Sequence, residues 1–265
     1  MHRLDQFYTN PSLAVILAGE VVDRFGGGNN TLYVEPSAGT GAFLEVLKKR
    51  DLWFHALDVE PKAENIQQGD FLLPNSIFDD KAHKTIVLGN PPFGKNASLA
   101  VKFFNRAAEK ADYIAFILPK TFRKQSIHSR LYTNFHLIED RDVPENSFLK
   151  DGQIYDVPCC WQIWEKRYEK RLRKQPPSID HIIEYTVPDY ADFAVRRVGF
   201  YAGRVIRSDI KSLSKTTHYF MKEIEPGASQ KIEATNWIDK ISQTAGARSL
   251  SKYEIAMEFL KHEAS

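Results

Sequence analysis

The sequence predicts an α/β fold with a mostly parallel β-sheet covered by helices on both faces, followed by a small β-rich module. Short, continuously apolar runs, such as Thr31 to Glu35 and Tyr113 to Leu118, alternate with amphipathic helical segments. Strands that are apolar along their whole length indicate burial on both faces of a sheet. The break Gln175-Pro176-Pro177-Ser178 ends this alternation and separates the two parts of the chain.

The first helix is expected to begin at Asn10-Pro11, because an asparagine cap followed by proline is typical of helix starts. His136 to Val143 and Asp156 to Trp164 are expected to pair antiparallel at one edge of the sheet. The remaining expected strands lie at 31–35, 53–59, 85–89 and 113–118, and the expected helices at 12–25, 41–50 and 98–111.

The second part of the chain contains short β-type segments separated by proline or glycine turns. This pattern predicts strands at 182–187, 192–198, 202–206 and 218–224, and a final helix at 255–262. We therefore expect two domains, at residues 1–170 and 176–265.

The composition is that of an ordinary soluble globular protein, with 43% apolar and 26% charged residues. A bilayer span needs roughly 20 consecutive apolar residues, and no such run or signal peptide is present, so we expect a cytoplasmic protein without a membrane partner. Cys159 and Cys160 are adjacent, and the histidines lack ligand spacing, so no metal site is expected. The sequence carries no signal of oligomeric state.

The most informative motif is Gly89-Asn90-Pro91-Pro92-Phe93-Gly94, which follows an apolar strand. Asn90 can offer its side-chain oxygen, and Pro91 leaves a rigid carbonyl as a second acceptor. Phe93 adds a ring for stacking. These groups predict a receptor for a planar exocyclic amine, and the alternative is a proline-stiffened turn.

A glycine loop, Glu35-Pro36-Ser37-Ala38-Gly39-Thr40-Gly41, follows the first strand of the sheet. Gly39 and Gly41 allow close approach of a ligand at this position, although a plain tight turn explains the same residues. The loop lacks the Gly-Lys-Ser/Thr of a phosphate-binding loop, and Leu44 replaces the third glycine of a dinucleotide fingerprint. An acidic residue and a proline before the glycines favour a cationic ligand.

Two acidic residues follow the glycine loop, and the first of them, Asp58, lies at the end of the next expected strand. Asp58 lies about 20 residues after the loop, where a carboxylate can accept from two ribose hydroxyls; a solvated turn carboxylate is the alternative. Asp70 and Phe71 place an acceptor beside a ring, which suits the amine and the face of adenine.

Together, these motifs resemble the S-adenosyl-L-methionine-dependent N6-adenine methyltransferases with an Asn-Pro-Pro-Tyr/Phe motif, over about residues 5–168. The resemblance implies a Rossmann-like class I methyltransferase fold: a seven-stranded, mostly parallel sheet with an antiparallel edge hairpin. It implies cofactor contacts from the motif Asp5 to Thr9, which includes Phe7, Tyr8 and Thr9, and from Glu35, Ser37, Ala38, Gly39, Gly41, Asp58, Asp70, Phe71 and Asn90. The catalytic motif would be Asn90, Pro91, Pro92 and Phe93.

The implied activity is methyl transfer from S-adenosylmethionine to the exocyclic amine of a flipped-out adenine in DNA. The Asp5 to Thr9 motif favours DNA over RNA as the partner. Methylation of RNA, at adenine N6 or guanine N2, is the first alternative, and methylation of a protein glutamine amide is a more distant one. A catalytically silent nucleic-acid-binding module is a third. The short spacing between the glycine loop and Asn90 implies that substrate recognition lies in the C-terminal module.

Basic residues supply candidate nucleic-acid contacts, because the net charge is only +2 and cations must cluster to attract a polyanion. Lys120, Arg123 and Lys124 follow a strand at the expected ligand edge, where an ordinary solvated loop is the alternative. Arg196 and Arg197 lie among aromatic residues of the C-terminal module. A β-module with charged outer faces explains that second pattern equally well.

Overall fold

The computed structural model describes residues 7–26, 28–74, 77–150, 152–172, 177–241 and 248–261. Two compact units are present: residues 1–122 with 127–173, and residues 123–126 with 174–265. Asp5 and Gln6 of the expected N-terminal motif lie outside the described residues.

A seven-stranded sheet forms the centre of the first unit, in the order β4-β3-β2-β5-β6-β10-β7. Neighbours from β4 to β6 are parallel, whereas β10 is antiparallel to both β6 and β7. The expected mostly parallel sheet with an antiparallel pair at its edge is confirmed. The strands are β2 (Thr31–Glu35), β3 (Phe54–Asp58), β4 (Gln67–Gln68), β5 (Lys84–Gly89), β6 (Tyr113–Pro119), β7 (Phe135–Asp142) and β10 (Cys159–Lys166).

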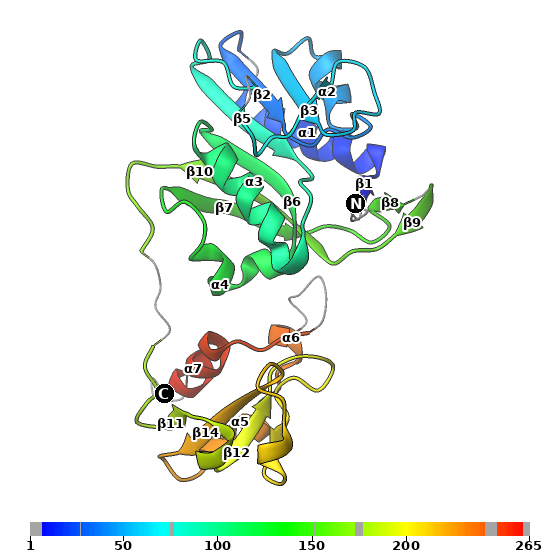
Figure 1. The fold of residues 1–265 in the computed structure, drawn as a ribbon. Coiled ribbons are helices and arrows are strands. Elements are labelled where there is room, and N and C mark those ends of the chain that lie inside the picture. Colours follow the sequence, from blue (N-terminus) through cyan, green and yellow to red (C-terminus); the bar gives the residue numbers. More distant parts are fainter. Residues whose placement is uncertain are drawn as a thin grey trace. The chain divides into compact units, whose positions relative to one another are not determined.

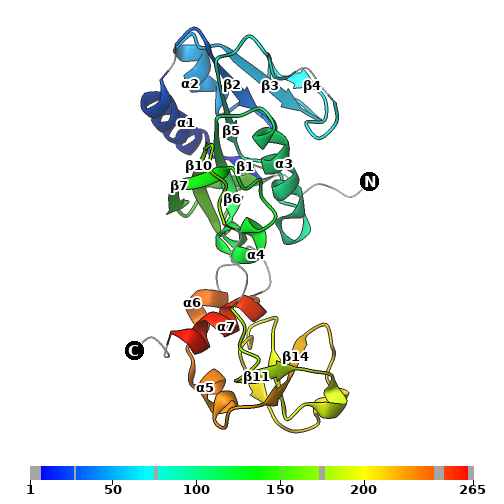
Figure 2. The same ribbon diagram turned by 90° about the vertical axis from the view of Figure 1, so that its left-hand side faces the viewer.

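Helices cover both faces of this sheet. α1 (Pro11–Phe25) and α2 (Leu44–Lys49) lie on one side, and α3 (Ser98–Ala108) lies on the other (Figure 2). Successive strand residues point to opposite faces: Ile86 packs with the first pair of helices and Val87 with α3. Two-sided burial explains why the central strands β2, β5 and β6 are mostly apolar.

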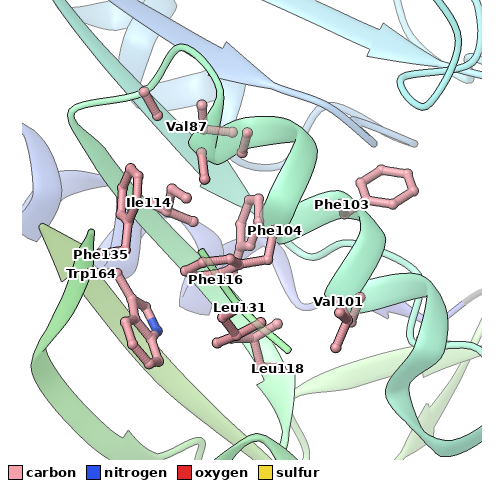
Figure 3. Packing of buried hydrophobic residues seen from close by; sticks show 14 of the residues in the cluster. Val87, Val101, Phe103, Phe104, Ile114, Phe116, Leu118, Leu131, Phe135 and Trp164 are labelled. Carbon is pink, nitrogen blue, oxygen red and sulfur yellow. The ribbon is translucent and has the colours of Figure 1, made fainter. Parts of the chain in front are cut away.

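Aromatic packing joins α3 to the antiparallel edge of the sheet. The Phe104 side chain is fully buried, with its ring centroid 5.8 Å from that of Phe135 and 5.2 Å from that of Trp164. Figure 3 shows these rings close together beside Phe116. The near-perpendicular ring pairs are a favourable arrangement for the aromatic quadrupole. They hold α3 against β7 and β10 at the edge of the sheet.

A small antiparallel sheet, β1-β8-β9, lies beside the main one (Figure 1). Its strands are β1 (Tyr8–Thr9), β8 (Phe148–Lys150) and β9 (Gln153–Tyr155). In the chain, β8 and β9 form an antiparallel hairpin between β7 and β10. Thr9 pairs with Phe148, so the beginning of the described chain is attached to this hairpin.

The second unit contains a four-stranded antiparallel sheet, in the order β11-β14-β12-β13, and helices packed on its core. The expected strands are present in shortened form. Helices α5 and α6 were not expected, and α7 begins earlier than predicted because Ser251 and Glu254 form a capping box. The elements are β11 (Ile183–Tyr185), β12 (Phe193–Arg196), β13 (Val205–Ile206), β14 (His218–Glu223), α5 (Ala228–Ala234), α6 (Ile238–Ile241) and α7 (Lys252–Leu260).

Short helical segments complete the described chain. These are η1 (Lys95–Ala97), η2 (Lys120–Arg123), α4 (Gln125–His128), η3 (Pro188–Tyr190) and η4 (Ile210–Ser212). No helix within the described residues is long and apolar enough to cross a membrane.

Replacing Phe104 with alanine should lower the free energy of unfolding of the first unit by about 3–5 kcal/mol, because the change leaves a cavity among packed rings. Denaturant unfolding measures this loss. Lys102→Ala, at an exposed position of the same helix, should change stability by at most about 0.5 kcal/mol. Equal losses in the two variants would contradict this packing account.

Candidate active site

The carboxyl ends of the parallel strands place the predicted polar residues at one edge of the sheet. Glu35 ends β2, Asp58 ends β3, and Asn90 follows β5. These strands are direct neighbours, so residues far apart in sequence converge at the edge where open α/β sheets bind ligands.

The glycine loop is fastened to the turn after β3 by hydrogen bonds. The Gly39 N–H donates to Asp58 Oδ2 at 2.7 Å, and the Glu60 N–H donates to Asp58 Oδ1 at 2.8 Å. The Lys62 N–H donates in turn to the Gly39 carbonyl at 2.9 Å. A carboxylate has about four lone-pair sites, so Asp58 is held by two donors and can still accept hydrogen bonds from a ligand.

Tyr8 of β1 packs directly against the glycine loop. Gly39 has a φ of +50°, and a Cβ at this position would lie only 2.9 Å from Tyr8 Cε1. Burial raises the pKa of Tyr8; the Lys62 ammonium opposes this shift, and the Asp58 carboxylate adds to it. Glycine is therefore required at position 39 both for its backbone conformation and for the close approach of the ring.

Glu35 is a buried carboxyl group with an unused acceptor. It is 2% exposed, and its Oε2 atom has no hydrogen-bond partner within the described part of the chain. Burial raises its pKa well above the ordinary value, and the nearby Asp58 charge raises it further. Gly89 makes room for this group, because a Cβ there would lie 3.2 Å from Glu35 Cγ.

The amide of Asn90 is held in one orientation. Its Nδ2 donates to the Phe7 carbonyl at 3.0 Å, and the Ser37 hydroxyl donates to the Asn90 carbonyl at 3.2 Å. A carbonyl can only accept, so the amide nitrogen must face Phe7 and the amide oxygen is left as an acceptor. No described residue donates to Asn90 Oδ1 or to the Pro91 carbonyl.

The rest of the motif leads into α3. Pro91 is buried, Pro92 is partly buried, and the partly buried Phe93 ring contacts both core clusters of the first unit. The Phe93 carbonyl accepts from the N–H groups of Leu99 and Ala100, at 3.0 and 3.2 Å. The motif is thus fixed to the core on both sides, and part of the Phe93 ring remains accessible.

Other expected cofactor residues differ in their exposure. Thr9 is 6% exposed and its hydroxyl lacks a partner among the described residues, while Ala38 is a buried member of the glycine loop. Asp70 is exposed, and its Oδ1 accepts from the Leu72 N–H at 2.9 Å. Phe71 is only 1% exposed and packs in the core against Phe103, so its ring does not lie open to a ligand.

Two of the predicted phosphate contacts have their charges paired. Lys120 Nζ lies 2.6 Å from Asp142 Oδ2. Lys124 belongs to the second unit, where its side chain is 9% exposed and its Nζ lies 3.3 Å from Glu254 Oε1. Arg123 also belongs to the second unit. Arg196 and Arg197 belong to it as well, and neither Arg196 nor Arg197 forms an ion pair with a described residue.

The sequence reasoning missed the contribution of the β8-β9 hairpin. The Tyr155 ring stacks on Phe7 with centroids 5.0 Å apart, and Lys150 Nζ lies 5.1 Å from the Phe7 centroid. These contacts support the residue that orients Asn90. No local motif marks Tyr155 or Lys150, because the pairing with β1 is long-range.

The described residues contain no group of three or more histidine, cysteine or acidic side chains arranged to hold a metal ion. Cys159 and Cys160 are buried and free of a disulfide. Burial raises the pKa of the Cys159 thiol, so the neutral form is favoured.

Replacing Glu35 with glutamine should change how stability depends on pH. The folded-state pKa of Glu35 is raised, so folding disfavours its ionised form, and this cost grows as the pH rises above the ordinary value of 4.5. The variant should therefore gain stability relative to the wild type between acidic and neutral pH, as measured by denaturant unfolding. A stability difference that does not change with pH would contradict the assignment.

No family model and no curated protein matches the sequence. Solved structures with a similar fold include a provisionally described RNA methyltransferase from Pyrococcus horikoshii, with 18% identity, a TM-score of 0.47, and coverage of 62% of this chain and 87% of that one. A provisionally described class I S-adenosylmethionine-dependent methyltransferase from Listeria monocytogenes shows 16% identity, a TM-score of 0.47, and coverage of 67% and 65%. The methyltransferase subunit of a type I restriction-modification system from Streptococcus thermophilus shows 14% identity, a TM-score of 0.43, and coverage of 60% and 45%.

Proposed function

We propose that this chain is an S-adenosylmethionine-dependent DNA methyltransferase that methylates the N6 amine of adenine. The observation that carries the proposal is the fixed Asn90 amide, whose nitrogen is bound to the Phe7 carbonyl. This bond leaves Asn90 Oδ1 as one acceptor, and the rigid carbonyl of the next residue, Pro91, is a second to which no described residue donates. Two acceptors at one strand end match the two hydrogens of an exocyclic amine.

The residues at the strand edge fit the cofactor. S-adenosylmethionine supplies an electrophilic sulfonium methyl group when it is bound. Asp58 would accept from the ribose hydroxyls, and its orientation is already set by the N–H groups of Gly39 and Glu60. The unpartnered oxygen atoms of Glu35 and Thr9 are buried polar groups that a ligand would satisfy.

The carboxylates also suit the charge of this ligand. Glu35 and Asp58 lie near enough for the charge of Asp58 to raise the pKa of Glu35. A cationic ligand placed between them would lower the cost of ionising Glu35, because an opposite charge favours the ionised form. A phosphate ligand would have the opposite effect.

Catalysis by this site would rest on positioning. The lone pair of an adenine N6 amine is delocalised into the ring, so the amine is a weak nucleophile. Asn90 Oδ1 and the Pro91 carbonyl would accept the two amine hydrogens and aim the nitrogen for in-line displacement. Phe93 would stack on the base, which in a duplex requires the nucleotide to be flipped out. Asparagine cannot act as a general base, so the proton would leave to water after transfer.

Asn90→Ala should abolish methyl transfer and leave cofactor affinity nearly unchanged, because the variant loses an acceptor for the amine while keeping Asp58 and the glycine loop. Transfer from methyl-labelled cofactor and calorimetric cofactor binding separate the two effects. Ser37→Ala is the matched control: it removes a donor to the Asn90 backbone and should lower the rate only partly. Wild-type rates in Asn90→Ala would overturn the proposal.

Asp58→Asn should weaken cofactor binding by about tenfold or more, because hydrogen bonds to a charged group contribute about 1.5–3 kcal/mol. Glu64→Gln makes the same charge change at an exposed position in the turn that follows, and should leave affinity unchanged. Isothermal titration with the cofactor tests both variants. Equal affinities for the wild type and Asp58→Asn would exclude Asp58 from the cofactor site.

A further inference from the structure

A tight turn in the second unit presents two large aromatic side chains to solvent. Phe200 is 70% exposed and Tyr201 is 57% exposed. Their rings meet edge to face, with centroids 5.2 Å apart and an interplanar angle of 85°. The remaining ring surface is open, although this unit has a well-packed core of its own.

The backbone of this turn is rigidly held. Gly199 and Gly203 both have positive φ values, +90° and +97°. The Gly203 N–H donates to the Arg196 carbonyl at 2.7 Å, and the Gly199 N–H donates to the Arg248 carbonyl at 2.8 Å. Gly203 also lies against Trp237, where a Cβ would come within 2.2 Å of the indole ring. The backbone of the turn therefore fixes the positions of the two exposed rings.

One arginine lies over each of the two exposed rings. The Arg248 guanidinium lies over Phe200 at 4.9 Å from the ring centroid, and that of Arg204 lies over Tyr201 at 6.0 Å. Arg196 Nε donates to the Val198 carbonyl at the base of the turn. Arg197 differs from these, since its guanidinium lies over Tyr219, 4.9 Å from the ring centroid.

None of these arginines forms an ion pair with a described residue, although the chain contains 34 acidic residues. Arg207 of the same unit, in contrast, pairs with Glu233 at 2.9 Å. Unpaired guanidinium groups beside open aromatic rings match a ligand that carries both phosphates and planar bases.

We propose that the Phe200–Tyr201 turn, with Arg196, Arg204 and Arg248, binds a strand of nucleic acid by stacking an unpaired base on the exposed rings. The arginines hold the flanking phosphates. This inference rests on the proposed function and deepens it, because it assigns the part of the second unit that holds the polymer. The ligand class is an unpaired strand, since a base inside a duplex has no free face for these rings.

The test measures binding of the full-length protein to fluorescently labelled single-stranded DNA by anisotropy, without cofactor and at several salt concentrations. The double variant Phe200→Ala with Tyr201→Ala should weaken binding by about tenfold or more. Tyr190→Ala is the matched control, because Tyr190 is 73% exposed in the same unit and no arginine among the described residues lies over its ring. It should bind like the wild type.

The arginine variants test the phosphate contacts separately. Arg204→Gln and Arg248→Gln should each lower the slope of log affinity against log salt by about 0.7–1. Arg207→Gln removes a paired charge and should change the slope less. Thermal unfolding of each variant checks that the unit remains folded.

Three outcomes would overturn the inference. They are wild-type binding by the double variant, equal losses in the double variant and Tyr190→Ala, and a change in self-association by sedimentation without a change in binding. The last outcome would assign the turn to a second copy of the chain. Loss of binding in the double variant, with no methylation of any nucleic acid by the wild type, would instead reject the proposed function alone.

Discussion

The hydrogen bond from Asn90 Nδ2 to the Phe7 carbonyl is the interaction on which the site depends. It joins residues 83 positions apart in the chain and leaves the amide oxygen as the only acceptor that this side chain can offer. Phe7 is held in turn by pairing of the neighbouring β1 residues with β8 and by stacking against Tyr155. A short peripheral sheet thus sets the orientation of the central side chain.

Charge is distributed differently in the two units. At the edge of the main sheet, the carboxyl groups of Glu35 and Asp58 lie where a cationic ligand is proposed, and burial together with the Asp58 charge raises the pKa of Glu35. In the second unit, Arg204 and Arg248, which form no ion pair with a described residue, lie over exposed aromatic rings. Lys120 and Lys124 have carboxylate partners instead. Under the two proposals, the first unit would bind the small cation and the second unit would bind the polyanion.

Local motifs made much of this arrangement predictable. The glycine loop, Asp58 and Asn90 each lie at the end of a strand that the apolar pattern marks, and parallel strands bring such ends together. Long-range contacts were not predictable. Phe71 comes shortly after a polar strand, yet its ring packs in the core. Lys124 Nζ donates a hydrogen bond to the Ser249 carbonyl, 125 positions away in the chain. Helices α5 and α6 were missed because segments of 7 and 4 residues carry too little periodicity.

The most direct measurement identifies the nucleoside that receives the methyl group. The protein is incubated with methyl-labelled S-adenosylmethionine and, separately, with duplex DNA, single-stranded DNA and RNA, and each polymer is then digested to nucleosides. The proposed amine receptor at Asn90 and Pro91 predicts label in N6-methyladenine from DNA. Label in RNA alone, label in guanine, or no transfer to any polymer would contradict it.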